Sequence, residues 1–412
     1  MKITVKNGSD LRPISGDYST TTLVELTPDS GLGRIPSNVL FLIDGSSSMG
    51  GDKWSTVKQA VAEIIDSLKD DDRVGVVLFD SGSKELFPLA SLSQNRQVMR
   101  DAILNLASPS GVTNLEAGLK QAYGSFDARS SADKVKRVNH IILLTDGFPT
   151  DNQGYRIEES QRYEEIVRKH EHITLTGVGI GSADDYDSSF ISKLSELGRG
   201  SYYHANDLTK FKQGLQEEVQ KLQSSVVGNL TLKFSAINCK MMRIAKVAPE
   251  IVIYDISGNK NSFEIAAGSM TKDMTTFIIQ TSHQGDGQIG SEIKLFDLIA
   301  SSDGKDSELS SIKVKTTDRE ADLGQVDPDV FRGIQMLQVH LNGEQIQASI
   351  NSGDKAKATR LIENTTKIAS NLGQAKVTKA LGQLSKDLEQ GKSVSDNLAT
   401  IKDEAKKTRL LV

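Results

Sequence analysis

Residues 36–222 alternate short apolar segments with longer stretches of helical periodicity. The apolar segments comprise residues 39–44, 73–80, 140–146 and 173–179. Between the first two, apolar side chains recur at steps of three and four residues from Trp54 to Leu68, as on one face of a helix. Buried strands that alternate with amphipathic helices build a mostly parallel sheet that is covered on both faces. We therefore predict an α/β domain over this part of the chain.

An aspartate and two serines at alternate positions follow the first apolar segment, as Asp44, Ser46 and Ser48. Side chains two residues apart in extended backbone share a face, so these three oxygens can point at one ion. Carboxylate and hydroxyl oxygens are hard ligands, which favours Mg²⁺, Mn²⁺ or Ca²⁺ over zinc. Because the chain is rich in serine, the motif alone is equally compatible with a surface turn in which Asp44 caps the next helix.

Two more oxygen-bearing residues occur where a strand ends or a helix begins. Thr113 opens a helical pattern, and Asp146 ends the apolar segment that begins at His140. In open α/β sheets, ligands bind outside the carboxyl ends of the strands, where Asp44 and Asp146 both lie. We therefore predict one divalent-metal site, with the ligands Asp44, Ser46, Ser48, Thr113 and Asp146.

With these residues, the segment resembles a von Willebrand factor type A (vWA) domain with an intact metal-ion-dependent adhesion site (MIDAS). The D-x-S-x-S motif of that family falls on Asp44, Ser46 and Ser48, its separate threonine on Thr113, and its T-D-G aspartate on Asp146. The resemblance implies a Rossmann-like sheet and an ion that the hydroxyls hold directly, with at least one aspartate behind a water. Such an under-neutralised ion favours a carboxylate from outside, so we expect a Glu or Asp of a partner protein to complete its coordination.

Other functions are compatible with a hard metal in an exposed cleft. A metal-dependent hydrolase or phosphatase would use the ion to activate water, but it needs a nearby base, a second metal or a basic clamp. We interpret the neighbouring Lys53, Lys84 and Asp151 as solvated surface charges. The sequence therefore predicts a non-enzymatic, metal-dependent interaction module or adaptor in an intracellular multiprotein assembly, one version of which is linked to an AAA+ ATPase. A structural assembly subunit with a vestigial metal site is a further alternative.

The flanking residues predict two other kinds of structure. Short strand-like segments separated by turns predict a β-sandwich over residues 223–320. The strand-like head, residues 1–35, has no place in the parallel sheet and is expected to complete this sandwich, with an independent extension as the alternative. Apolar stripes at helical spacing after Pro328 predict a helical bundle over residues 326–412.

Composition bounds the location and the partners of the protein. The single cysteine, Cys239, can form no internal disulfide, and we find no apolar run long enough for a leader or a membrane span. A cytoplasmic location is therefore expected, with Mg²⁺ as the default ion. Residues 354–412 carry twelve Lys or Arg against seven Asp or Glu, but no aromatic residue follows Phe331. Because nucleic-acid binding usually combines basic and aromatic side chains, we do not expect it here.

Overall fold

The protein forms two compact units, each assembled from segments that are separate in the sequence. The computed structural model describes residues 1–130, 135–151, 153–157, 160–257, 261–286, 288–319, 322–324 and 326–407. The first unit comprises Met1–Leu32, Asn229–Lys392 and Glu404–Val412. The second unit comprises Gly33–Gly228 and Ser393–Asp403. No helix among the described residues is long and apolar enough to cross a membrane.

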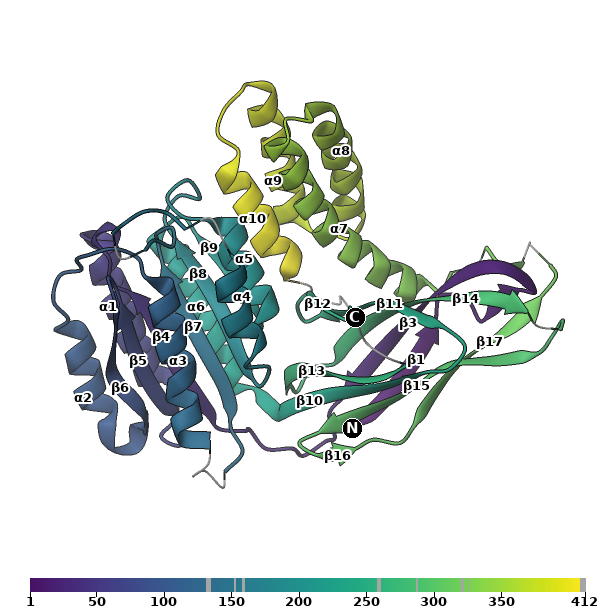
Figure 1. The fold of residues 1–412 in the computed structure, drawn as a ribbon, viewed down its shortest axis with the longest axis horizontal. Helices are drawn as coiled ribbons and strands as arrows, with labels where there is room; N and C mark the ends of the chain where they lie inside the picture. The colour runs from purple at the N-terminus through teal and green to yellow at the C-terminus, as the bar shows by residue number, and fades with distance from the viewer. Residues whose placement is uncertain are drawn as a thin grey trace. The chain divides into compact units, whose positions relative to one another are not determined.

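A six-stranded sheet forms the centre of the second unit, in the order β6-β5-β4-β7-β8-β9 (Figure 1). All neighbours are parallel except β6, which runs antiparallel to β5. The central strands are buried on both faces, which explains their continuous apolar sequences. The strands are β4 (Ser37–Asp44), β5 (Arg73–Phe79), β6 (Ser83–Ser91), β7 (Val138–Thr145), β8 (Ile173–Ile180) and β9 (Arg199–Ala205).

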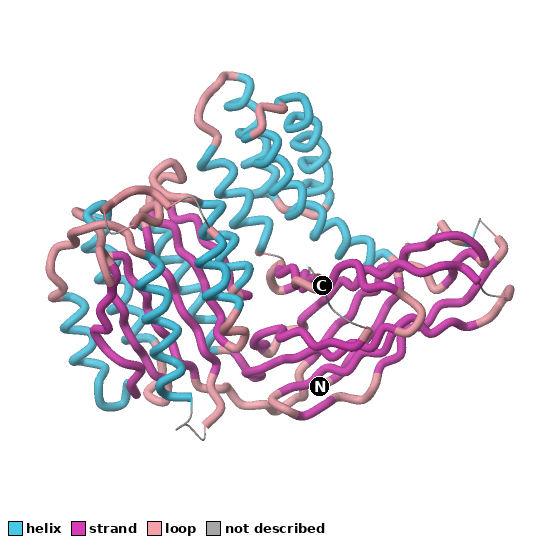
Figure 2. Tube along the Cα trace, in the orientation of Figure 1, coloured by secondary structure: helices cyan, strands magenta, loops and turns pink. Residues whose placement is uncertain are grey.

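Helices cover both faces of this sheet (Figure 2), which confirms the predicted Rossmann-like α/β architecture. On one face, Phe41 and Ile43 of β4 pack against α1 (Asp52–Ser67), α2 (Leu92–Leu104) and α6 (Leu208–Gln223). On the other face, Leu40 and Leu42 pack against α3 (Leu115–Ser130), α4 (Gln161–Arg168) and α5 (Ser188–Leu197). The alternation along β4 follows from the two-residue period of a strand.

Two elements of the second unit were not expected from the sequence. Strand β6 is an edge strand on which all residues except Leu89 are exposed or half-buried, so it lacks the continuous apolar run of its neighbours. Helix α5 contains four serines in ten residues, and three of them, Ser188, Ser192 and Ser195, are buried. Small polar residues at buried positions weaken the apolar periodicity on which the expectation of a helix depends.

The first unit contains a strand-rich region with two sheets. One sheet has the order β1-β3-β14-β11-β12, and the other has the order β13-β10-β15-β17-β2, with β16 paired to β15. The longest strand, β3, lies between β1 and β14, so the head of the chain is part of this region. The strands are β1 (Lys2–Asn7), β2 (Leu11–Pro13), β3 (Ser15–Thr27), β10 (Ser225–Ala236), β11 (Lys240–Ala248), β12 (Val252–Tyr254), β13 (Ser262–Thr271), β14 (Thr275–Asp286), β15 (Glu292–Ser302), β16 (Lys305–Asp306) and β17 (Ser310–Thr317).

The C-terminal helices are α7 (Pro328–Asn351), α8 (Lys355–Asn371), α9 (Ala375–Glu389) and α10 (Ser395–Lys406). Val330 and Leu337 of α7 pack on Leu23 and Ile278 of the first sheet, so α7 shares a core with the strands. Residues 393–403 belong instead to the second unit, where Asp396 Oδ1 accepts a hydrogen bond from the Ala183 N–H at 2.6 Å.

Candidate metal site

The five residues predicted as metal ligands lie together at the carboxyl ends of two adjacent strands. Asp44 is the last residue of β4, and Ser46 and Ser48 follow it in a loop that contains the short 3-10 helix Ser47–Met49. Asp146 directly follows β7, the parallel neighbour of β4. Thr113 lies just before α3. The edge of the sheet therefore gathers residues that are about a hundred positions apart in the sequence.

Four of these residues are connected by hydrogen bonds. Asp44 Oδ1 accepts a hydrogen bond from the Ser46 N–H at 2.9 Å, and the Ser46 and Ser48 hydroxyls are 3.1 Å apart. The Ser48 hydroxyl donates to Asp146 Oδ1 at 2.8 Å. Neighbouring oxygens of a Mg²⁺ octahedron are about 3 Å apart, as metal–oxygen distances of about 2.1 Å require. The oxygen spacing therefore fits a small, hard cation.

Thr113 faces the same space as Ser48. A Cβ added to Gly147 would lie 3.0 Å from Thr113 Oγ1 and 3.5 Å from Ser48 Oγ, so both hydroxyls border the space beside this glycine. Thr113 is held in place by Thr150, because its N–H donates to Thr150 Oγ1 and its carbonyl accepts from the Thr150 N–H, both at 2.9 Å. Gly147 thus leaves open a cradle that a side chain would fill.

Backbone hydrogen bonds fix the loop that carries the two serines. The Gly45 N–H donates to the Phe79 carbonyl at 2.7 Å, and the Ser110 N–H donates to the Gly45 carbonyl at 2.8 Å. The Ser47 N–H donates to the carbonyl of Gly111, whose φ of +88° is a left-handed conformation that favours glycine. The position of the hydroxyls therefore depends on three loops that support one another.

The site concentrates negative charge away from water. Asp44 and Asp146 are almost completely buried, whereas Ser48 is exposed and opens the cluster to solvent. Burial, and to a smaller extent the charge of Asp146, raise the pKa of Asp44 to about 6, although hydrogen bonds from Thr145 and Ser46 oppose the rise. Two buried carboxylates need a compensating cation, so the electrostatics of the site as well as its oxygens suit a divalent ion.

Lys53 supplies part of this compensation, and its interpretation as a solvated surface charge was wrong. It lies on the first turn of α1, and its Nζ is 2.6 Å from Asp146 Oδ2. The Lys53 side chain is 30% exposed, whereas the Asp146 side chain is fully buried. Lys53 and Asp146 are far apart in the sequence, so no local pattern predicts their contact, although Lys53 follows the serine loop by only a few residues.

Two other residues of the site were also missed. Thr145 donates its hydroxyl to Asp44 Oδ2 at 2.6 Å, and Gly147 leaves room beside Thr113 and Ser48. Both flank Asp146 within the T-D-G sequence, so the signal for them was present in the motif itself. The threonine supports a ligand and the glycine makes space for one.

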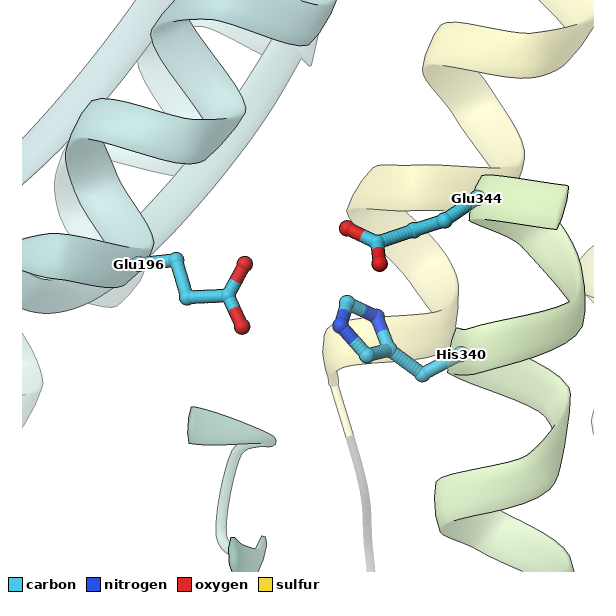
Figure 3. Close-up of side chains that lie close together, drawn as sticks. All are labelled: Glu196, His340 and Glu344. Atoms are coloured by element: carbon cyan, nitrogen blue, oxygen red, sulfur yellow. The ribbon is translucent and has the colours of Figure 1, made fainter. Parts of the chain in front are cut away.

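A second group of side chains with metal-binding atoms is labelled in Figure 3. His340 and Glu344 lie one turn apart on α7 of the first unit, whereas Glu196 lies on α5 of the second unit. Within the first unit, the pair on α7 offers two ligands, fewer than the three or four that protein metal sites usually provide. We therefore assign no metal site to α7.

An open, mostly parallel sheet with oxygen ligands at its carboxyl edge defines a class of α/β ligand-binding domains. Residues 38–237 match the family model of the von Willebrand factor type A domain. This segment thus has the fold of a vWA domain, as the resemblance in the sequence implied.

Three known proteins illustrate how far the similarity extends. An uncharacterised protein of Synechocystis sp. is 23% identical over 92% of this chain and 88% of its own length. Inter-alpha-trypsin inhibitor heavy chain H2 of Mus musculus is 31% identical over 41% of this chain, but the match covers only 18% of that protein. The solved structure of a von Willebrand factor type A protein from Catenulispora acidiphila covers 99% of this chain and 97% of its own, with a TM-score of 0.82 and 19% identity. At that identity, the structural match shows a shared fold.

Proposed function

We propose that the protein is a non-enzymatic, divalent-metal-dependent interaction module that binds a carboxylate of a partner protein at the cluster around Asp44 and Asp146. Ser46, Ser48 and Thr113 would hold the ion directly, and the two aspartates would anchor it directly or through waters. When bound, the ion would supply an open coordination position for an oxygen ligand from outside. We further propose that the module works in the cytoplasm as an adaptor within a larger assembly, with Mg²⁺ as the resident ion.

The observation that carries this proposal is the close spacing of the Ser46 hydroxyl, the Ser48 hydroxyl and the Asp146 carboxylate. The Ser46–Ser48 distance of 3.1 Å and the Ser48–Asp146 distance of 2.8 Å suit one small cation, and the exposed Ser48 leaves the site open to solvent. A vestigial site would have no need of this spacing or of the space beside Gly147.

The charges at the site favour a carboxylate as the outside ligand. Asp44 and Asp146 contribute two negative charges, and Lys53 contributes one positive charge. A divalent ion bound among them would leave the site with one net positive charge. A single Glu or Asp side chain from a partner would neutralise that charge while it fills the open position.

The test begins with metal binding by the full-length chain, measured by isothermal titration calorimetry with Mg²⁺ and Mn²⁺. We expect wild type and Ser55→Ala to bind one ion, and Ser46→Ala and Thr113→Ala to lose most of their affinity. Ser55 is the matched control, because its exposed hydroxyl donates to the nearby Asp52 carbonyl and not to a candidate ligand.

Partner binding is then measured by affinity capture with the same variants, in Mg²⁺ and in EDTA. Proteins that are captured only by metal-binding variants, and only with Mg²⁺, would support adhesion through the ion. Equal capture by Thr113→Ala and in EDTA would contradict the proposal and favour the vestigial-site alternative.

A further inference from the structure

Lys53 and the metal ion that we propose would compete for the charge of the same carboxylate. Asp146 uses both of its oxygens, because Oδ1 accepts from the Ser48 hydroxyl at 2.8 Å and Oδ2 contacts the Lys53 ammonium at 2.6 Å. The ammonium therefore occupies one side of a carboxylate whose other side faces the cluster of hydroxyls.

The surroundings of Lys53 leave room for its ammonium at this position. Lys53 lies in the first turn of α1, and this helix begins directly after Gly50 and Gly51. The neighbouring Gly181 has a φ of +103°, and a Cβ there would lie 3.3 Å from Lys53 Nζ and 3.2 Å from Asp185 Oδ2. The absence of a side chain at Gly181 thus leaves room for the ammonium beside Asp146.

We propose that Lys53 is a tethered counter-cation that stabilises the metal-free site and lowers its affinity for divalent cations. This inference rests on the proposed function. The ammonium balances one of the two buried negative charges when the ion is absent, and it repels the ion when the ion is present. The site would then fill at a higher concentration of free divalent cation than it would with the oxygen ligands alone.

The proposal predicts opposite effects of one substitution on two measured quantities. Lys53→Met keeps most of the side-chain length and removes the charge. We expect it to bind Mg²⁺ and Mn²⁺ about tenfold more tightly than wild type, because a unit charge one carboxylate away from a divalent ion acts on it with at least that factor even in a high dielectric. We also expect the metal-free protein to melt at a lower temperature, because the charges of Asp44 and Asp146 lose their compensation.

Two control variants separate the charge of Lys53 from other effects. Lys53→Arg keeps the charge and should bind metal nearly as wild type does. Lys212→Met removes a lysine of the same unit that pairs with Glu63 at 3.1 Å, away from the site. It makes the same change in net charge, so it should leave metal affinity and the stabilisation by metal unchanged.

The four full-length proteins are titrated with Mn²⁺ and with Mg²⁺ by calorimetry. Their melting temperatures are then measured in EDTA and in saturating Mg²⁺. Trp54, the only tryptophan of the chain, lies next to Lys53 and donates its indole N–H to the Ala107 carbonyl, so its quenching by Mn²⁺ gives an independent readout. Equal or weaker metal binding by Lys53→Met, with no loss of metal-free stability, would overturn the role of Lys53 alone. Absence of binding by wild type and Lys53→Met together would overturn the proposed metal site as well.

Discussion

Gly147 lies where the oxygen cluster has no room for a side chain. A Cβ at this position would be 3.0 Å from Thr113 Oγ1, which is closer than side chains normally pack. We expect Gly147→Ala to displace Thr113 and to weaken Mn²⁺ binding by roughly tenfold or more, because metal sites tolerate displacements of only about 0.2 Å. Calorimetric titration measures this loss. The overpacking itself should cost only about 1 kcal/mol of folding free energy.

The control for this substitution is Gly124→Ala on α3. A Cβ there meets no atom within 4 Å, so alanine should keep wild-type metal affinity and slightly stabilise the helix. Unchanged Mn²⁺ affinity in Gly147→Ala would mean that Thr113 does not contact the ion.

His283 predicts a loss of stability in mild acid. Its Nδ1 accepts from the buried Arg12 at 2.8 Å, so its Nε2 carries the proton and donates to Thr20 Oγ1 at 2.9 Å. Burial, and then the charge of Arg12, lower the pKa of His283 from 6.5 to about 4. As pH falls from 6.5 to about 4, the unfolded chain takes up a proton that the folded chain does not. The free energy of unfolding should therefore fall, by up to about 3 kcal/mol.

Urea unfolding of wild type and His283→Gln at pH 7 and pH 5 measures this effect. Glutamine can still accept from Arg12 and does not titrate, so the variant should lose less stability than wild type between the two pH values. An equal loss in both proteins would assign the acid sensitivity to other groups, such as the buried His204, whose pKa burial also lowers to about 4.

The five predicted ligands and the missed Lys53 differ in the kind of information that locates them. Asp44, Ser46 and Ser48 are close in sequence, and the carboxyl edge of a parallel sheet brings Asp146 beside them, so a pattern of strands sufficed to predict the cluster. The contact between Lys53 and Asp146 joins residues 93 positions apart and depends on the direction of one side chain on α1. Periodicity places a helix on a face but does not determine such a direction.

At the scale of elements, α6 is attached to the sheet by one buried carboxylate. Glu218 of α6 accepts hydrogen bonds from Thr176 of β8 at 3.0 Å and from Tyr203 of β9 at 2.9 Å, and it lies 3.2 Å from His140 of β7. Three strands therefore contact one side chain of the helix. Because a buried carboxylate must be paired to remain in the core, these contacts fix the position of α6 along the sheet.

Replacement of Glu218 should reveal how much of the stability of the second unit depends on these contacts. We expect Glu218→Ala to cost about 3 kcal/mol, because it leaves buried donors on Thr176 and Tyr203 without this acceptor. Glu218→Gln keeps one acceptor and should cost about 1 kcal/mol. Glu217→Ala, at the adjacent half-exposed position, is the matched control, and urea unfolding is the measurement. A cost for Glu218→Ala no greater than that of the control would contradict an anchoring role.

The elements that the sequence predicted are those whose burial produces a strong pattern. Strands β4, β5, β7 and β8 are buried on both faces, and α1 and α6 bury one continuous stripe. Strand β17 is buried on one face only, and its buried Ile312 and Val314 alternate with exposed lysines. An alternation this short gives a weaker signal than a continuous apolar run.

At the scale of the whole molecule, the first unit depends on residues from both ends of the chain. Strand β3 pairs with β1 on one side and with β14 on the other, and Leu23 of β3 lies in the core that α7 also enters. The two chain segments that lead into the second unit are also joined, because the Ile35 N–H donates to the Ser225 carbonyl at 2.9 Å. Pairing between residues so distant in sequence leaves no local pattern. The sequence supports it only indirectly, because the strand-like residues 1–35 have no place in the parallel sheet.

Deletion of residues 1–32 should therefore damage one unit and spare the other. The deletion removes β1, β2 and β3, exposes the paired edge of β14 and uncovers the apolar face that Leu23 shares with α7, so the first unit should become sensitive to proteolysis. The second unit keeps its sheet and all five candidate ligands, so Mn²⁺ affinity should remain within about twofold of wild type. A smaller deletion of residues 1–7 removes only the edge strand β1 and keeps the pairing of β3 with β14, so it should have a weaker effect. Limited proteolysis measures the damage to the first unit in both deletions, and calorimetry measures their Mn²⁺ affinity. Loss of Mn²⁺ binding on deletion of residues 1–32 would show that the metal site depends on the first unit.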